Sequence, residues 1–270
     1  IGATWNELSG WRILGGHSMS EVIDGSILKR IIDSGLSRET VDHFVERVSD
    51  GEIVDKLSNQ SVSSSGLEIN QVTYDSSQSQ RAIEVLRAGQ FGMVVLNGGM
   101  ATRFGGVAKG TVEITETLSF LGAKLKDAKR LVRRVQAPDP WIFLMCSSAT
   151  LEPTKTHLEE HNFFGYDPDK LHLFVQCESV RFRPQGGLFR DPDGNPSFHG
   201  TGHGDLPYCI RALPSFQAFA RKGKALLLSN VDNVLATVDL SILGSFLASE
   251  LPIQVEVVDK NTGDVGGAPL

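Results

Sequence analysis

The residues best suited to chemistry lie between Val94 and Ile114, in the stretch VVLNGGMATRFGGVAKGTVEI. An apolar run ends at Asn97 and is followed by two pairs of glycines, by Arg103 and by Lys109. Glycines let the backbone approach a ligand closely and adopt positive φ, so that several main-chain N–H groups can point at one anion. Arginine can donate to two phosphate oxygens at once, and lysine supplies a mobile point charge. The pattern predicts a phosphate-binding loop that is neither a Walker A nor a GxGxxG motif.

Two further polar residues stand directly after apolar runs. Gln176 ends the run LHLFVQ, and its side-chain amide offers a donor and an acceptor together, which suits the edge of a base. Asp232 follows the run ALLLSN, and a carboxylate there can hold a Mg²⁺ ion that bridges substrate phosphates. For Gln176 the alternative is an ordinary polar residue at a strand end, and for Asp232 it is an ordinary turn after a strand. In the same way, a glycine-rich turn with surface cations is the alternative for the loop after Asn97.

The segment DPDGNPSFHGTGHGDLPY carries His199 and His203 four residues apart, with Asp205 close by. A metal site built on these three residues is conceivable. On a helix this spacing would align two ligands, but three interspersed glycines disfavour a helix. Main-chain contacts to a ligand through the glycines are the better interpretation. Asp205 has a second possible role, as the cap of a helix that begins at Leu206.

These residues need a sheet to bring them together, and the sequence from Phe91 onward predicts one. Short apolar runs alternate with helical patterns, which indicates an α/β fold with a mostly parallel sheet and helices on both faces. In such sheets ligands bind beyond the carboxyl ends of the strands. The predicted strands cover residues 92–97, 141–147, 171–176, 225–230 and 253–258; the predicted helices are Thr117–Val135, Glu152–His161, Leu206–Ala220 and Leu240–Ala248.

The sequence before Phe91 has a different pattern, with helical segments and no apolar strand-like runs. Helical patterns run through residues 19–49 and 79–89, and a polar segment at 58–66 reads as a linker. We therefore expect a small helical N-terminal segment over residues 1–90 and an α/β domain over residues 91–270.

Composition limits the classes of protein. Among 270 residues, 40% are hydrophobic and 21% charged, which is ordinary for a globular domain, and the net charge is −6. This acidic balance argues against a nucleic-acid partner. No apolar run reaches the ~18 residues of a membrane span, and no secretory leader opens the chain. The three scattered cysteines fit reduced thiols, so we expect a cytoplasmic protein without a membrane partner.

Taken in order, these motifs resemble the UTP–glucose-1-phosphate uridylyltransferase family, also called UDP-glucose pyrophosphorylase. LNGGMATRFGGVAKG resembles the nucleotide loop of that family, and GTGHGDL resembles its GHGD segment. LLLSNVDNVLATVDL resembles its metal segment, and VVDKNTGDVGGAP resembles its sugar-pocket segment. The likeness covers roughly residues 91–270. It implies a Rossmann-like nucleotide-diphospho-sugar transferase sheet of GT-A-like type, and it implies that the C-terminal part of this domain is missing from the chain.

The resemblance also implies a role for each site residue. Arg103 and Lys109 would be catalytic and hold the departing pyrophosphate, and Asp232 would be the Mg²⁺ ligand. The sugar would contact Asn233, Gly266 and Gly267. The nucleotide would contact Leu96, Asn97, Gly98, Gly99, Gln176, His203 and Gly204, with Asp205 helping to order its loop.

The implied reaction forms UDP-glucose and pyrophosphate from UTP and glucose 1-phosphate, by in-line attack on the α-phosphorus with the help of Mg²⁺. A UDP-N-acetylhexosamine pyrophosphorylase, or an enzyme with broader sugar tolerance, is the nearest alternative. A non-catalytic nucleotide- or sugar-binding module is an alternative from another class. A purely structural domain is disfavoured, because glycines, cations and Asp232 would then follow the strands without a cause.

Overall fold

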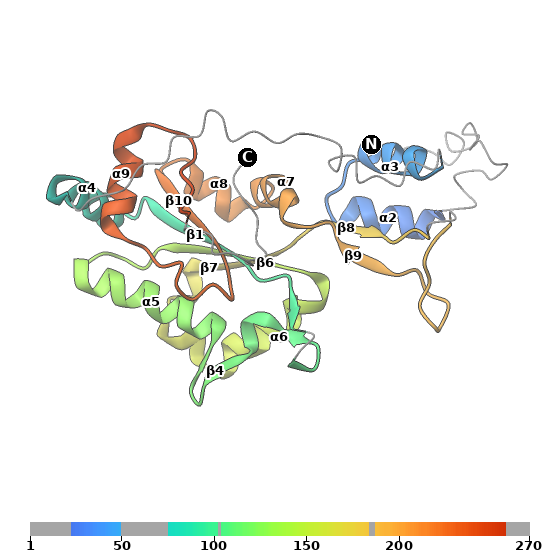
Figure 1. Ribbon diagram of the computed structural model, residues 1–270, viewed down its shortest axis with the longest axis horizontal. Coiled ribbons are helices and arrows are strands. Elements are labelled where there is room, and N and C mark those ends of the chain that lie inside the picture. The colour runs from blue at the N-terminus through green and yellow to red at the C-terminus, as the bar shows by residue number, and fades with distance from the viewer. Residues whose placement is uncertain (1–22, 50–74, 102–103, 184–186, 258–270) are drawn as a thin grey trace, which may run out of the picture.

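The computed structural model describes residues 23–49, 75–101, 104–183 and 187–257. Its centre is a four-stranded sheet in the order β10-β1-β6-β7, and every neighbouring pair is parallel (Figure 1). The strands are β1 (Phe91–Leu96), β6 (Trp141–Cys146), β7 (Leu171–Val175) and β10 (Ala225–Asn230). These four predicted strands are confirmed. Numbered along the chain, their order is 3-2-1-4, which is the order in the first part of a Rossmann sheet.

Helices cover both faces of this sheet, as expected (Figure 1). Alternate side chains of β1 enter different clusters: Phe91, Met93 and Val95 face one side, and Val94 and Leu96 face the other. The first side is covered by α4 (Ser76–Arg87), α5 (Phe120–Val135), α6 (Ser148–Glu160) and α9 (Leu240–Ser249); the second is covered by α7 (Leu206–Arg211) and α8 (Pro214–Ala220).

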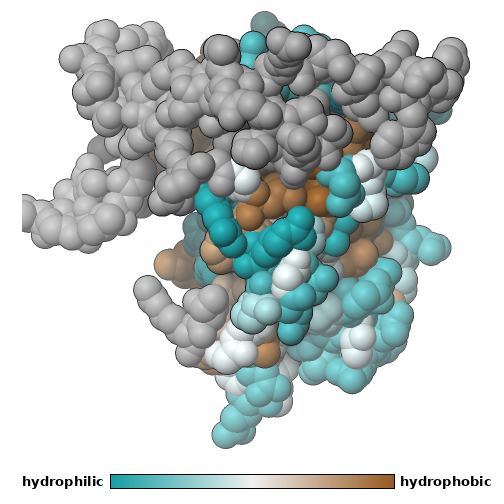
Figure 2. Space-filling view, turned by 90° about the vertical axis from the view of Figure 1, so that its right-hand side faces the viewer, coloured by the Kyte–Doolittle hydropathy of each residue, from teal (hydrophilic) through white to brown (hydrophobic). Residues whose placement is uncertain are grey.

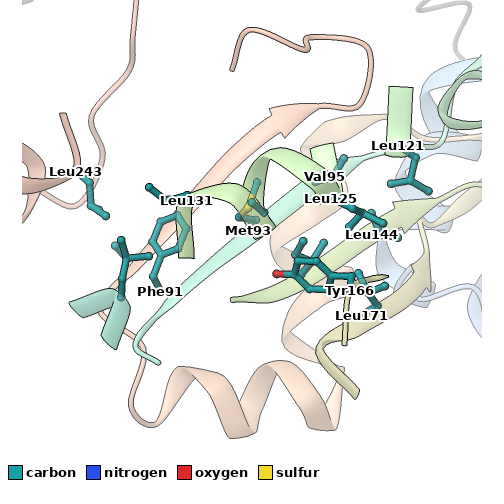
Figure 3. Packing of buried hydrophobic residues seen from close by; sticks show 14 of the residues in the cluster. Phe91, Met93, Val95, Leu121, Leu125, Leu131, Leu144, Tyr166, Leu171 and Leu243 are labelled. Carbon is teal, nitrogen blue, oxygen red and sulfur yellow. The ribbon is translucent and has the colours of Figure 1, made fainter. Parts of the chain in front are cut away.

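The larger core lies between β1 and α5. Figure 3 shows Phe91, Met93 and Val95 of β1 among Leu125 and Leu131 of α5. Val95 is fully buried and Leu125 is 1% exposed, and burying a side chain of this size contributes about 1.5–3 kcal/mol. This packing fixes the strand from which the glycine-rich loop departs.

The N-terminal helices pack on a separate small hairpin. The helices α2 (Gly25–Asp33) and α3 (Arg38–Ser49) share an apolar cluster with residues next to and within β8 (Glu178–Val180) and β9 (Phe198–Gly200). Arg30 Nε of α2 also donates to the Glu178 carboxylate at 3.0 Å. In contrast, α4 packs into the larger core against α9. The division of the chain at residue 90 stays a prediction.

Two predicted elements are wrong. Residues 253–257 form no strand, because a strand needs a neighbour that supplies main-chain hydrogen bonds and none of the described strands pairs with them. The single helix predicted over Leu206–Ala220 is divided into α7 and α8. Pro214 begins α8, and proline pushes the preceding Leu213 to extended backbone, with ψ 124°.

Two other helices begin at residues different from those predicted. The helix expected from Thr117 begins at Phe120, because Leu118 and Ser119 first pair with residues 113–115 in a hairpin. The helix expected from Glu152 begins earlier, at Ser148. The remaining short elements are the strands β2 (Met100–Ala101), β3 (Val107–Ala108), β4 (Glu113–Thr115) and β5 (Leu118–Ser119), with the 3₁₀ turns η4 (Lys109–Thr111), η5 (Asn162–Gly165), η6 (Pro168–Lys170) and η7 (His203–Asp205).

On the side seen in Figure 2, hydrophilic residues predominate among the described residues, around a small apolar area. Among the described residues, none of the helices combines the length and apolar character needed to cross a bilayer.

Candidate functional site at the carboxyl edge of the sheet

The predicted site segments leave the sheet along one edge. Leu96 pairs with Asn230 on one side and with Met145 on the other. Beyond these pairs, Val231 N–H donates to the Leu96 carbonyl at 3.1 Å, and Gln176 N–H donates to the Cys146 carbonyl at 2.8 Å. The edge includes the point where the strand order reverses, between β1 and β10, which is where α/β sheets of this kind bind ligands.

The glycine-rich loop folds back as a hairpin. Its strands β2 and β3 pair antiparallel, and Lys109 N–H donates to the Gly99 carbonyl at 3.0 Å. Positive φ occurs at Gly105 (81°) and Gly106 (76°), at the tip, and neither Gly98 nor Gly99 needs it. Gly98 instead serves close approach, because a Cβ there would lie 3.1 Å from Gln176 Oε1, whereas a Cβ on Gly99 would make ordinary contact, at 3.4 Å, with the Lys109 stem.

Asn97 anchors the start of this loop from the interior. Its side chain is fully buried, and its Nδ2 donates to Thr154 Oγ1 of α6 at 2.9 Å. Thr150 Oγ1 of α6 donates to the Asn97 carbonyl, also at 2.9 Å. In this structure Asn97 therefore holds the backbone that leads into the glycines; its Nδ2 faces α6, and its Oδ1 lies against Gly110 without a hydrogen-bond partner among the described residues. The Leu96 carbonyl is likewise occupied, by Val231 N–H.

Lys109 and Asp232 meet across the point where the strand order reverses. Lys109 Nζ donates to Asp232 Oδ2 at 2.9 Å, and the side chains are 42% and 38% exposed. An ion pair as exposed as this contributes only about 0–1 kcal/mol. Both charges therefore remain available to a ligand that carries a higher charge. The loop after β1 and the carboxylate after β10, which are 123 residues apart in sequence, lie at one place.

Gln176 lies between two glycine backbones. A Cβ added to Gly98 would lie 3.1 Å from Gln176 Oε1, and a Cβ added to Gly200 would lie 1.5 Å from Gln176 Nε2. Gly98 follows β1 and Gly200 ends β9, so the amide of Gln176 is held where these two segments converge. Sequence reasoning predicted main-chain contacts through the glycines of this segment but missed the contact of Gly200 with Gln176; Gly200 stands two residues before the GHGD segment.

The GHGD segment forms the short turn η7, in which His203 and Gly204 are exposed. His199 Nδ1 donates a hydrogen bond to the Gly200 carbonyl oxygen at 2.9 Å. Among the described residues, no group of three His, Cys, Asp or Glu side chains could hold a metal ion. The alternative of a His199, His203 and Asp205 metal site is therefore wrong.

Asp205 precedes α7, but its side chain forms no capping hydrogen bond, so the predicted capping role is wrong. Its Oδ2 is buried and has no hydrogen-bond partner among the described residues. Burial raises the pKa of Asp205 above the ordinary value of 3.8, because desolvation disfavours the charged form.

This environment predicts that Asp205→Asn stabilises the protein at neutral pH. A raised pKa means that the folded state holds the proton more tightly than the unfolded state does. Wild-type stability therefore falls as pH rises from 3.8 through the folded pKa, and the loss is complete above it. Asn has the same shape without a charge, so the variant should melt at a higher temperature at pH 7. The gain should vanish below about pH 4.

Thermal unfolding of both proteins between pH 4 and pH 8 measures this difference. Asp193→Asn is the matched control, because Asp193 is exposed and should give the same melting temperature as wild type at each pH. A gain that does not change with pH, or a variant that is less stable at pH 7, would contradict the burial argument.

Lys124 is a second residue that sequence reasoning missed. It is only 3% exposed, and its Nζ donates to the Ala236 carbonyl at 2.7 Å, in the turn that follows Asp232. Burial lowers the pKa of Lys124, and the carboxylates of Asp127 and Asp232 act in the opposite direction. Lys124 thus adds positive charge near Asp232 and holds its turn. The sequence does contain a signal for this burial, because Lys124 lies on the same apolar face of the helix as Leu121, Leu125 and Ala128.

Asn233 occupies the same turn, where its Oδ1 accepts from Ala236 N–H at 3.2 Å. Three further predicted site residues, Arg103, Gly266 and Gly267, lie outside the described residues. The structure thus brings together Gly98, Gly99, Lys109, Gln176 and Asp232 along one edge of the sheet.

Comparison with known proteins decides the family. The model of the family described as UTP--glucose-1-phosphate uridylyltransferase matches residues 38–270. The chain belongs to this uridylyltransferase family. A UTP--glucose-1-phosphate uridylyltransferase from Encephalitozoon cuniculi is 31% identical over 194 residues, which are 71% of this chain and 37% of that protein.

The relatives within the uridylyltransferase family differ in the sugar that their names state. A UDP-N-acetylglucosamine pyrophosphorylase from Saccharomyces cerevisiae is 28% identical over 165 residues, 58% of this chain and 34% of that protein. A mutant UDP-glucose pyrophosphorylase from Leishmania major, solved with UDP-glucose, shares the fold with a TM-score of 0.63. It is 21% identical, and the match covers 89% of this chain and 50% of that one. The chain spans well under half the length of the two curated relatives.

Proposed function

We propose that the protein transfers the uridylyl group of UTP to a sugar 1-phosphate, with glucose 1-phosphate as the first candidate, and releases pyrophosphate. The observation that carries this proposal is the contact between Lys109 and Asp232, at 2.9 Å. It brings a cation of the glycine-rich loop and a strand-end carboxylate to the point where such sheets bind nucleotides. Membership of the uridylyltransferase family supports the same reaction.

In this reaction an oxygen of the sugar 1-phosphate attacks the α-phosphorus of UTP. The bond from that phosphorus to the oxygen bridging to the β-phosphate breaks, and pyrophosphate leaves in line. The attacking phosphate is already ionised, so no general base and no covalent enzyme intermediate are needed. The protein contributes alignment of the reactants and neutralisation of the charge that develops.

Each part of the edge has a task in this proposal. The main-chain N–H groups after β1 hold the triphosphate, Lys109 turns from Asp232 to the departing pyrophosphate, and Arg103 is the second cation that we assign to the pyrophosphate. Gln176, held between Gly98 and Gly200, donates to and accepts from the edge of uracil, and Gly204 faces the same base. On the sugar side, the contacts come from Asn233, Gly266 and Gly267.

Asp232 fits a Mg²⁺ ion. Its carboxylate oxygens are hard ligands at an exposed edge, and Mg²⁺ is usually held by one or two protein carboxylates together with substrate phosphates. When bound, the ion neutralises phosphate charge and aligns the phosphates for in-line displacement.

A UDP-N-acetylhexosamine pyrophosphorylase is the second candidate, because the yeast relative carries that name. The decisive experiment mixes UTP and Mg²⁺ with glucose 1-phosphate, galactose 1-phosphate or N-acetylglucosamine 1-phosphate and measures pyrophosphate release. It is done on the 270-residue chain and on the longest form that its gene encodes. UTP binding in a calorimeter without pyrophosphate release from either form would favour a binding module instead.

The position of Gln176 gives a sharper test of the nucleotide site. Gly200→Ala places a Cβ 1.5 Å from Gln176 Nε2, so the amide must move. Since a displacement of about 1 Å can cost up to 10²-fold, we expect the KM for UTP to rise about 10-fold or more. Steady-state kinetics with varied UTP measures this change.

A double-mutant cycle provides the control for this prediction. If Gly200→Ala acts through the amide, the pair Gly200→Ala and Gln176→Ala should be no worse than Gln176→Ala alone. Additive losses would show that Gly200 acts on something other than Gln176, and an unchanged KM in Gly200→Ala would remove Gln176 from the nucleotide site.

A further inference from the structure

Two of the three cysteines lie against each other beside the predicted uracil position. Cys177 directly follows Gln176 and lies between β7 and β8, and Cys209 lies in α7. Their Sγ atoms are 3.1 Å apart, and both are free thiols. Cys146 is separate from this pair, because its Sγ contacts Asn97 Nδ2.

The geometry is close to that of a disulfide. A disulfide has sulfur atoms about 2.05 Å apart, so these two must approach by only about 1 Å. Cys177 lies in the short connection between β7 and β8, and Cys209 lies on a helix of only six residues, so small movements of α7 supply that approach. The two residues are 32 positions apart, and a bond between them would close a loop that contains β8, β9 and η7.

The two thiols differ in their exposure to solvent, and this difference determines which of them reacts first. Cys177 is 1% exposed, and burial, together with the neighbouring Cys209, raises its pKa to about 12. Cys209 is partly exposed and meets an external reagent first. Cys177 then reacts within the molecule, where proximity offsets its poor ionisation.

We infer that Cys177 and Cys209 form a reversible oxidation site that exchanges with a low-molecular-weight disulfide such as glutathione disulfide. In the first step the Cys209 thiol loses its proton and its sulfur attacks the glutathione disulfide, which forms a mixed disulfide and releases one glutathione. In the second step the Cys177 sulfur attacks Cys209 in that mixed disulfide, forms the internal bond and releases the second glutathione. The protein loses two electrons and two protons, and one glutathione disulfide becomes two glutathione molecules.

A disulfide between Cys177 and Cys209 would shift the segment between β9 and α7. The Cys177 carbonyl already accepts from Thr201 N–H and from Thr201 Oγ1, both at 3.1 Å. The Gln176 amide lies against Gly200, and η7 with His203 runs directly into α7. Pulling α7 toward Cys177 therefore shifts η7 relative to Gln176. This part of the inference rests on the proposed function, and it predicts that the oxidised form binds UTP less tightly.

The first experiment tests the bond itself. The reduced protein is incubated with mixtures of reduced and oxidised glutathione, free thiols are alkylated after denaturation, and peptides are identified by mass spectrometry. We expect a linked peptide pair containing Cys177 and Cys209, with Cys146 alkylated, and no linked pair in Cys209→Ser. The inference is overturned if Cys209 stops at the glutathione adduct, or if Cys146 supplies the partner.

The second experiment tests the coupling to the nucleotide. Calorimetry should give a Kd for UTP about fivefold or more higher for the oxidised than for the reduced protein, and Cys209→Ser should not respond to glutathione disulfide. By reciprocity, UTP should lower the oxidised fraction at a fixed glutathione ratio. Equal affinities would overturn the coupling. If even the reduced protein fails to bind UTP, the proposed function fails, and the linked peptide alone decides the thiol site.

Discussion

Asp232→Asn should lower turnover about 100-fold or more while the protein remains folded. The substitution keeps the shape of the side chain and removes the charge that we assign to the Mg²⁺ ligand. The lost carboxylate also ends the 2.9 Å ion pair with Lys109, but that exposed pair contributes little to stability. Pyrophosphate release measured against Mg²⁺ concentration should show lower activity at every concentration, with a melting temperature close to that of wild type.

Asp193→Asn is the matched control for charge, because Asp193 is exposed in the turn that precedes β9. It should leave turnover and its Mg²⁺ dependence unchanged. Turnover near the wild-type rate in Asp232→Asn would show that the carboxylate is not the metal ligand, and the proposal would then lose the residue that joins β10 to the phosphate site.

Local patterns were enough to predict the four strands of the central sheet and the positions of the loops that follow β1 and β10. The runs at 91–96 and 141–146 are apolar throughout because β1 and β6 are covered on both faces, and such strands are visible without knowing their partners. Asp232 could be placed at an edge for the same reason, since the parallel order of the sheet puts all carboxyl ends together.

Contacts between segments that are distant in the sequence could not be predicted from local patterns. The inward direction of the Asn97 side chain depends on Thr154, 57 residues later. The importance of Gly200 depends on the position of Gln176, and the apolar pattern at 253–258 looked like a strand although no described strand pairs with it. In each case a short pattern fixes which residues are apolar or flexible, and the tertiary partner decides what they do.

Lys109→Met should weaken the pyrophosphate side of the reaction most. The methionine keeps the apolar stem that passes Gly99 and removes the ammonium group, which now lies against Asp232. Loss of one preorganised charge at the departing group typically costs about 10²–10³-fold, so kcat/KM for pyrophosphate in the reverse reaction should fall by about 100-fold. The KM for the UDP-sugar should change far less, because the base and the sugar are held by other residues.

The reverse reaction, started from UDP-glucose and pyrophosphate with each varied in turn, separates these two effects. Lys126→Met is the control, since Lys126 is an exposed lysine on α5 and its loss changes the net charge equally. Lys109→Arg should recover part of the rate, because a guanidinium group still neutralises phosphate charge from nearly the same place. Unchanged kinetics in both directions for Lys109→Met would remove Lys109 from the site. The contact with Asp232 would then be an ordinary surface ion pair, and pyrophosphate would have to be held by Arg103 and by the main-chain N–H groups that follow Asn97.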